Sequence, residues 1–259
     1  MKPVGRFFYL SSDYRRWYNF SNTLSSGLTK KNMNHERPYF PISDDALAYL
    51  SGRCARLRRA IEIIPPIRNP IEPDPFAAVV STIVGQQISG KAQDGILARI
   101  SAQFGKIAIE NLSDASVEDL RGAGVSERKA NTIRTFISEI QNGKLNLAEF
   151  ETAPDQEIID RLTALKGIGL WTAEMLLIFT LQRPNVISFG DLGIRRGLSR
   201  LYGKEKIDRS FFEDRAALYS PVATVASLYL WKIAEPDCPT ELTRPPSPVP
   251  SPATAPAPQ

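Results

Sequence analysis

The chain has 259 residues, of which 42% are hydrophobic, so it is long enough for one sizeable core or two small ones. Its two cysteines, Cys54 and Cys238, lie far apart without C-x-x-C spacing, which excludes a disulfide framework and argues against a Cys-ligated zinc or iron–sulfur site. The net charge of +4 is uneven: residues 1–35 hold six Lys or Arg against one Asp, whereas residues 36–259 are about neutral. Binding to a polyanion must therefore depend on a local basic surface.

Both ends of the sequence have the composition of unfolded segments. Residues 1–36 are basic and rich in Ser and Asn, and they are compatible with a transit peptide, an arm that follows DNA, or sequence upstream of a start at Met33. Residues 241–259 form a Pro-rich tail, which leaves residues 37–240 as the folded body. No apolar stretch approaches the roughly 18 residues of a membrane span. We therefore expect no membrane association and no secretion, with a location in the cytoplasm or nucleoid of a bacterium or the nucleus of a eukaryote.

The body predicts an all-α fold, because helical periodicity recurs along it and no alternating strand pattern does. Ser43 and the two aspartates after it cap a first helix. Residues 75–89 carry one apolar stripe at i, i+3 and i+4 spacing, and a further helix ends at Gly105. Two short helices joined at Gly122 and Gly124 are expected next. The remaining helices are expected within residues 154–181, 191–203 and 224–235.

The segment Lys166–Gly169 interrupts a helical pattern that resumes at once. A glycine inside a helix costs about 1 kcal/mol relative to alanine, so Gly167 and Gly169 need a reason. Glycines allow a positive φ and let a partner approach the main chain closely. The amides of Gly169, Leu170 and Trp171 would then form an anion site at a helix N-terminus, suited to a nucleic-acid phosphate. A plain turn between two packed helices is the alternative interpretation.

Two features beyond this turn strengthen the first interpretation. Residues 161–209 hold nine Lys or Arg against four acidic residues, which indicates either a surface that faces nucleic acid or an ordinary solvated helix face. Asp191 follows Gly190 and starts an amphipathic helix. An aspartate at the start of a helix is a standard N-cap, and the helix N-terminus favours its ionised form.

The ordered set LKGIGLWTAEMLLIF and FGDLGIRRGL resembles the helix-hairpin-helix (HhH-GPD) DNA glycosylases, specifically their 3-methyladenine DNA glycosylase II branch. The resemblance runs from about Pro38 to Glu235 and includes AAVVSTIVGQQIS, GAGVSERKANTI and SLYLWK. It implies an all-α, two-lobed fold with the active-site cleft between the lobes. It also places the helix-hairpin-helix at about 155–181 and makes Asp191 the catalytic residue.

The resemblance carries over further residues by position. The base pocket is expected to include Trp171, Trp231, Met175 and Leu192. The residues expected at DNA are Lys166, Gly167, Gly169, Leu170, Thr172, Gln87, Arg195, Arg196 and Lys129. Gln87 falls near the residue that fills the gap left by a flipped nucleotide. Core packing remains the alternative for Trp231, and a place on a helix surface remains the alternative for Gln87.

The resemblance also bears on cofactors. Family hairpins bind a monovalent cation, Na⁺ or K⁺, through main-chain carbonyls, which here belong to Thr163, Leu165 and Ile168. No cofactor is implied for catalysis, and the iron–sulfur cysteines of other branches are missing. Relatives that cut the strand carry a lysine nucleophile where this chain has Trp171. Without that amine no Schiff base forms, so lyase activity is not expected.

Taken together, these features predict a monofunctional DNA glycosylase that hydrolyses the N-glycosidic bond of alkylated bases in duplex DNA, acting as a monomer. A carboxylate near C1′ stabilises the oxocarbenium-like transition state of this reaction. Trp171 would attract a cationic base by roughly 0.5–2 kcal/mol. Two alternatives stay open: a glycosylase of the same fold for oxidised or deaminated bases, and a non-catalytic helix-hairpin-helix DNA-binding protein.

Overall fold

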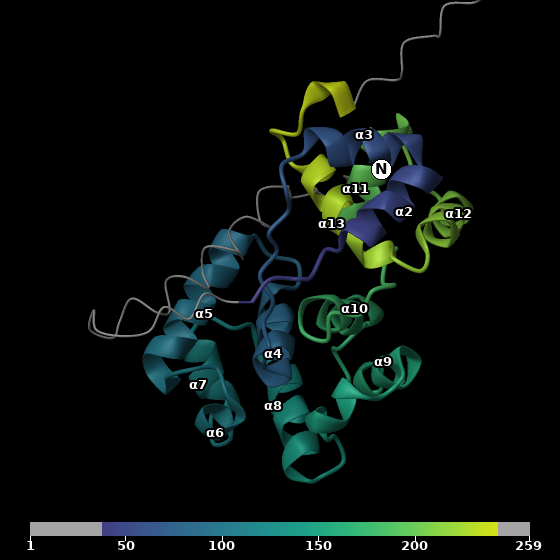
Figure 1. Cartoon of the computed structure of the whole chain (residues 1–259). Helices are drawn as coiled ribbons and strands as arrows, with labels where there is room; N and C mark the ends of the chain where they lie inside the picture. The colour runs from purple at the N-terminus through teal and green to yellow at the C-terminus, as the bar shows by residue number, and fades with distance from the viewer. Residues whose placement is uncertain (1–37, 243–259) are drawn as a thin grey trace, which may run out of the picture.

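The computed structural model describes residues 38–242 (Figure 1). The predictions for residues 1–36, and for all but the first two residues of the Pro-rich tail, lie outside these described residues. Within them the all-α prediction is confirmed, since the β pairing found there is an isolated bridge between Tyr39 and Pro70. Thr240–Leu242 form a short 3₁₀ helix in which Leu242 is buried, so the described residues include the first two of the expected Pro-rich tail. No helix of this described part is both long and apolar enough to cross a membrane.

The helices form two lobes, and the first lobe contains the first and the last helices of the described chain (Figure 1). Its helices are α2 (Asp44–Arg53), α3 (Ala55–Ile63), α11 (Leu192–Tyr202), α12 (Arg209–Tyr219), α13 (Ala223–Ala234) and η2 (Thr240–Leu242). Helices α11 and α13 pack against each other very closely. A Cβ at Gly197 would lie 2.2 Å from the Leu230 carbonyl oxygen, so only glycine permits this approach.

The second lobe is built from the middle of the chain. Its helices are α4 (Pro75–Gly85), α5 (Gly90–Phe104), α6 (Ile109–Leu112), α7 (Val117–Gly122), α8 (Glu127–Gln141), η1 (Leu147–Glu151), α9 (Asp155–Thr163) and α10 (Leu170–Phe179). Helix α4 is apolar around most of its circumference because it packs against α5, α8 and α10. Phe76 on α4 stacks on Phe136 of α8, with ring centroids 5.7 Å apart.

The helix boundaries follow local signals in the sequence. Ser43 caps α2 by accepting the Ala46 amide at 3.2 Å, and Gly105 ends α5 with φ +83°. The expectation of two short helices around Gly122 and Gly124 is half right: α7 is short, but α8 has 15 residues. An amphipathic pattern with buried Ile133 sustains its full length.

The chain crosses between the lobes twice, through residues 64–74 and 180–191. The first crossing contacts the end of α10, where the Glu72 amide donates to the Phe179 carbonyl at 2.9 Å. The second crossing is anchored on α13, since the Val186 amide donates to Thr224 Oγ1 at 2.9 Å. This crossing ends at Asp191, which therefore lies where the lobes join.

Candidate active site

Gly167 lets the hairpin between α9 and α10 pack closely against α8. This residue has φ +96°, and a Cβ there would lie 2.1 Å from Thr132 Oγ1 on α8. The Gln86 side-chain amide donates to the Gly167 carbonyl at 3.2 Å and to Thr172 Oγ1 at 3.1 Å. The turn is therefore held by α8 on one side and by the end of α4 on the other.

Gly169 differs from Gly167 in both respects. Its φ is −104°, which other residues adopt readily, and no atom lies within 4 Å of the place of a Cβ. The expected positive φ is therefore found at Gly167, while close approach of a partner at Gly169 stays a prediction. Gly169 is exposed at the N-cap of α10, which has no side-chain cap, so the first amides of the helix face outward.

Asp191 is held by three N–H donors. Its Oδ1 accepts the Ile194 amide at 2.8 Å, which makes it the N-cap of α11 as the sequence predicts. Oδ1 also accepts the indole N–H of Trp231 at 2.9 Å. Oδ2 accepts the indole N–H of Trp171 at 2.8 Å. A carboxylate that only accepts is suited to three donors, and they fix the orientation of its two oxygens.

The two tryptophans therefore position the carboxylate. Trp171 is partly exposed, whereas Trp231 is only 6% exposed and packs on Phe179 with ring centroids 5.4 Å apart. Gly193 makes room for Trp231, because a Cβ there would lie 2.7 Å from its Cδ1 atom. Core packing and a polar contact with the site thus coexist at Trp231. A role of either ring as a wall of the base pocket stays a prediction.

The other two residues expected in the base pocket have opposite environments. Met175 is buried at 5% exposure on α10, within the hydrophobic core. Leu192 is 42% exposed at the start of α11, directly after Asp191. Leu192 is therefore available to a bound molecule without rearrangement, whereas Met175 would need the site to open. Their roles toward a base stay predictions.

Several of the residues expected at DNA lie on the surface around the hairpin. Lys166 and Leu170 are exposed, whereas the side chain of Thr172 is buried and bonded to Gln86. Gln87 is exposed at the tip of the turn between α4 and α5, with φ +57°. A positive φ is unusual for a residue with a side chain, and Gln87 adopts it at an exposed position of this turn.

Arg195 and Arg196, two further residues expected at DNA, lie on α11 beyond Asp191 and are both partly exposed. The Arg195 guanidinium lies over the Phe189 ring, 5.5 Å from its centroid. This contact lets Arg195 rest against an apolar surface while its charge stays near the site.

Lys129 is engaged inside the protein. Its ammonium donates to the carbonyls of Val84 at 2.8 Å and Gln86 at 2.6 Å, which end α4. Burial, and to a smaller extent the charge of Arg128, lower the pKa of Lys129. The ammonium thus fixes the turn that presents Gln87, and any contact of Lys129 with DNA would compete with these two bonds.

The carbonyls expected to bind a monovalent cation belong to the turn that follows α9. The Leu165 carbonyl accepts the Ile168 amide at 3.0 Å, while those of Thr163 and Ile168 accept no main-chain hydrogen bond within residues 38–242. A carbonyl oxygen has two lone pairs, so Leu165 keeps one for a cation. All three groups therefore fit such an ion chemically.

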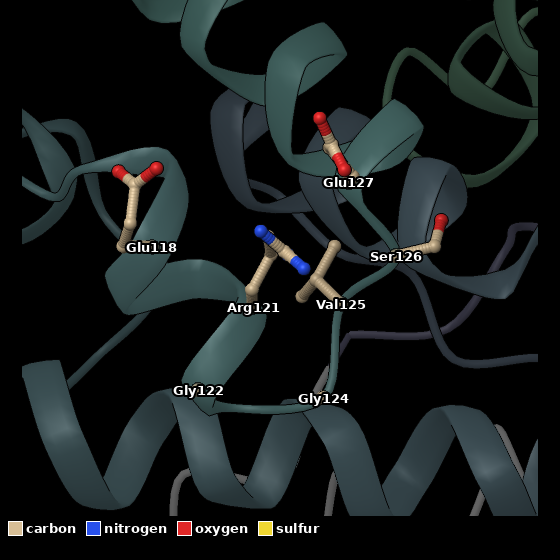
Figure 2. A pocket seen from close by; sticks show the side chains of 7 residues that line it. All are labelled: Glu118, Arg121, Gly122, Gly124, Val125, Ser126 and Glu127. Atoms are coloured by element: carbon tan, nitrogen blue, oxygen red, sulfur yellow. The ribbon is translucent and has the colours of Figure 1, made fainter.

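A surface hollow of about 550 Å³ lies away from Asp191, where α7 turns into α8. Figure 2 shows Arg121 between Glu118 and Glu127 at this hollow. The floor is formed by the second glycine turn, in which Gly124 has φ +95°. Two carboxylates beside one guanidinium make this hollow a poor site for an anion.

Two residues near the site were missed by sequence reasoning. Gln86 connects α4 to the hairpin, and Glu174 lies on α10 one turn after Trp171. Gln86 contacts residues more than 80 positions away, so its own segment carries no signal for this role. Glu174 had a signal, since it is a charged residue among the apolar side chains of LWTAEMLLIF.

Known proteins share the sequence pattern of this chain. The sequence profile of the HhH-GPD superfamily of base excision DNA repair proteins matches residues 80–218, more than half of the chain. The chain belongs to this superfamily. DNA-3-methyladenine glycosylase 1 of Schizosaccharomyces pombe is 31% identical over 195 residues, which cover 72% of this chain and 86% of that protein. The HhH-GPD match includes the hairpin and Asp191, and Trp231 lies beyond it.

Solved HhH-GPD structures agree with the fold. A DNA-3-methyladenine glycosidase from Bacillus halodurans is 40% identical, with a TM-score of 0.67 over 76% of this chain and 92% of that chain. The S. pombe 3-methyladenine DNA glycosylase Mag1, solved in complex with abasic DNA, is 31% identical, with a TM-score of 0.67 over 73% and 95%. The resemblance seen in the sequence and the expected two-lobed helical fold are thereby confirmed.

Proposed function

We propose that this protein is a monofunctional DNA glycosylase that releases alkylated purines of the 3-methyladenine type from duplex DNA, the first step of base excision repair. Relatives from two yeasts and a Bacillus carry the name of this activity. The Mag1 structure holds abasic DNA, which is the product of base release. The observation that carries the proposal is the 2.8 Å bond from Trp171 to Asp191, because it joins the hairpin helix directly to the carboxylate.

The chemistry assigned to Asp191 is stabilisation of positive charge on the sugar. Cleavage of the N-glycosidic bond passes through an oxocarbenium-like transition state, which a fixed carboxylate stabilises and toward which it orients water. The three donors to Asp191 hold the carboxylate before substrate arrives, so little reorganisation is needed during the reaction. A cationic alkylpurine is already a good leaving group and needs no strong general acid.

The acceptor of the sugar is water in this proposal. Trp171 supplies an indole where an amine would be needed for a Schiff base, so the strand stays intact after base release. Abasic product should therefore break only after alkali or heat. No covalent complex should form with borohydride.

The hairpin is proposed to grip the DNA backbone without reading sequence. Neither the backbone conformation nor the packing requires a glycine at position 169. Close approach of an outside group to the α10 N-terminus is therefore the remaining explanation.

We also propose that a monovalent cation binds the carbonyls of Thr163, Leu165 and Ile168. We propose that the protein acts as a monomer, in the cytoplasm or nucleoid of a bacterium or in the nucleus of a eukaryote.

The deciding experiment compares base release from methylated duplex DNA by the wild type and by Asp191→Asn. Asparagine keeps an N-cap for α11, so the variant should fold. We expect release to fall by about a thousandfold or more, which corresponds to about 4 kcal/mol of lost transition-state stabilisation. Binding to a duplex with an abasic analogue should change little. Full activity of Asp191→Asn would remove the catalytic assignment.

A panel of lesions separates this proposal from its two alternatives. Duplexes containing 3-methyladenine, 7-methylguanine, hypoxanthine or 8-oxoguanine should be tested with the same enzyme preparation. Faster release of the two methylated bases supports the proposal. Preference for hypoxanthine or 8-oxoguanine would indicate a glycosylase for deaminated or oxidised bases. Binding without release of any base would indicate a non-catalytic DNA-binding protein.

A further inference from the structure

Helix α10 carries a second carboxyl group close to the site, which the proposed reaction does not use. Glu174 follows Trp171 by one helical turn and faces the loop that leads to Asp191. Its Oε2 atom is shielded from solvent and lacks a hydrogen-bond partner, and so does the hydroxyl of fully buried Ser188. The Ser188 hydroxyl is near enough to lower the pKa of Glu174, although no regular hydrogen bond engages either its oxygen or Glu174 Oε2.

Three groups act on the Glu174 carboxyl: Ser188 and Asp191 from the loop, and Arg209 from the start of α12. Burial is the main cause that raises the pKa of Glu174, to about 7, and the negative charge of Asp191 raises it further. The Ser188 hydroxyl and the charge of Arg209 act in the opposite direction and lower the pKa. Arg209 does not neutralise Glu174, because it pairs with Glu213 at 3.1 Å and its side chain is 64% exposed. Repulsion between two charges is mutual, so an ionised Glu174 also acts on the surroundings of Asp191.

Such a group is unfavourable for the fold alone. A buried carboxylate without full hydrogen bonding lowers stability, and an apolar side chain would serve this position on α10 better. Carboxyl groups in this condition gather at functional sites. Glu174 lies near the loop that carries Asp191, so a role at this site is the explanation to test.

We infer that the half-buried carboxylate of Glu174 adds a second negative charge near Asp191 and thereby favours substrates with a cationic base. This inference rests on the proposed function and specifies its substrate class. When Glu174 is ionised, two negative charges stabilise the net positive charge that a cationic base brings to the site, whereas release of a neutral base develops no net charge there. When Glu174 takes up a proton, this advantage decreases, so selectivity for cationic bases depends on pH.

The test compares the wild type with Glu174→Gln in single-turnover release of 3-methyladenine from methylated duplex DNA between pH 5.5 and 8.5, at enzyme concentrations below saturation so that the rate includes binding of the cationic base. Both enzymes act on the same substrate at each pH, so any effect of ionisation of the lesion is the same for both and drops out of the ratio of the two rates. We expect the wild type to be roughly tenfold faster at pH 8 and about equal at pH 5.5. The rate ratio for hypoxanthine, a neutral base, should stay near one. Glu174→Asp, which keeps the charge, should keep the pH dependence.

The controls distinguish the ways in which the inference can fail. Glu110→Gln removes the same charge from an exposed position on α6 and should match the wild type at every pH. A Glu174→Gln to wild-type ratio that is constant with pH would mean a merely structural role and would overturn the inference. Rapid release by the wild type without preference for cationic bases would overturn it as well. No release by the wild type would overturn the proposed function itself, and this inference with it.

Discussion

Each oxygen of Asp191 has an indole donor of its own, and the main chain adds a third bond at Oδ1. The three bonds are not equivalent in origin. The Ile194 amide comes from the same helix and would hold an aspartate in any N-cap. The two indoles come from α10 in one lobe and α13 in the other, so the orientation of the carboxylate depends on how the two lobes are packed together.

Removing one indole donor should slow base release without unfolding the protein. Trp171→Phe and Trp231→Phe each keep an aromatic ring and lose one N–H donor. A hydrogen bond to a charged group contributes about 1.5–3 kcal/mol, so release should slow by roughly 10- to 150-fold. Single-turnover rates on methylated DNA test this, with thermal unfolding as the control. Unchanged rates in both variants would show that the indoles do not position Asp191.

Glu174 makes a prediction about stability that is independent of activity. Its folded-state pKa of about 7 lies above the ordinary 4.5, so the folded protein holds this proton more tightly than the unfolded chain. Stability should therefore fall as pH rises from about 4.5 to 7. Above this interval Glu174→Gln should be more stable than the wild type by about 1–3 kcal/mol, and at pH 4 the two should agree. Denaturant unfolding at pH 4 and pH 8 measures this difference, and equal stability at pH 8 would contradict it.

At the scale of elements, we expect the two glycines of the hairpin to have different roles: Gly167 in stability and Gly169 in DNA binding. Gly167→Ala meets both a positive φ and the Thr132 side chain, so it should destabilise the protein by about 1–3 kcal/mol. Gly169→Ala meets neither obstacle and should leave the free energy of unfolding within about 0.5 kcal/mol. Gly169→Val should instead weaken binding to duplexes of any sequence. Unfolding curves and DNA titrations of all three variants test the division, and equal stability losses at both positions would contradict it.

The elements also show what the sequence could reveal. Asp191 as an N-cap, the hairpin at 166–169 and the end of α5 at Gly105 follow from local chemistry, so they were predictable. Helix α3 escaped prediction because Cys54, an unusual cap, precedes it. Helix α12 was missed although Asp208 gives an ordinary capping signal.

The interior of the site was less accessible to sequence reasoning. The bonds from the two indoles to Asp191 join residues 20 and 40 positions apart, and those from Gln86 span more than 80. No local pattern encodes such separations, so the resemblance to a family located the tryptophans but not their hydrogen bonds. The turn glycines were likewise indistinguishable in the sequence, because only packing separates Gly167 from Gly169.

At the scale of the whole molecule, charge governs how the protein meets DNA. Residues 36–259 are about neutral, so attraction to a polyanion depends on basic side chains near the site. Lys166 at the hairpin and Arg196 on α11 lie in the two lobes on either side of the crossing that ends at Asp191. A duplex bound at this junction would be contacted by both lobes.

This arrangement predicts a modest salt dependence that a few side chains control. Each phosphate contact contributes about −0.9 to the slope of log K against log salt concentration, so Lys166→Gln and Arg196→Gln should each reduce that slope by about 0.9. Lys144→Gln, which removes an exposed charge paired with Glu139, should leave the slope unchanged. Lys129→Met should alter the slope less than Lys166→Gln does, because its ammonium already serves two carbonyls. Titrations of an undamaged duplex between 50 and 200 mM salt, a range over which such slopes are resolved, supply the measurement. If Lys144→Gln reduced the slope as much as Lys166→Gln, the DNA would lie on another face of the molecule.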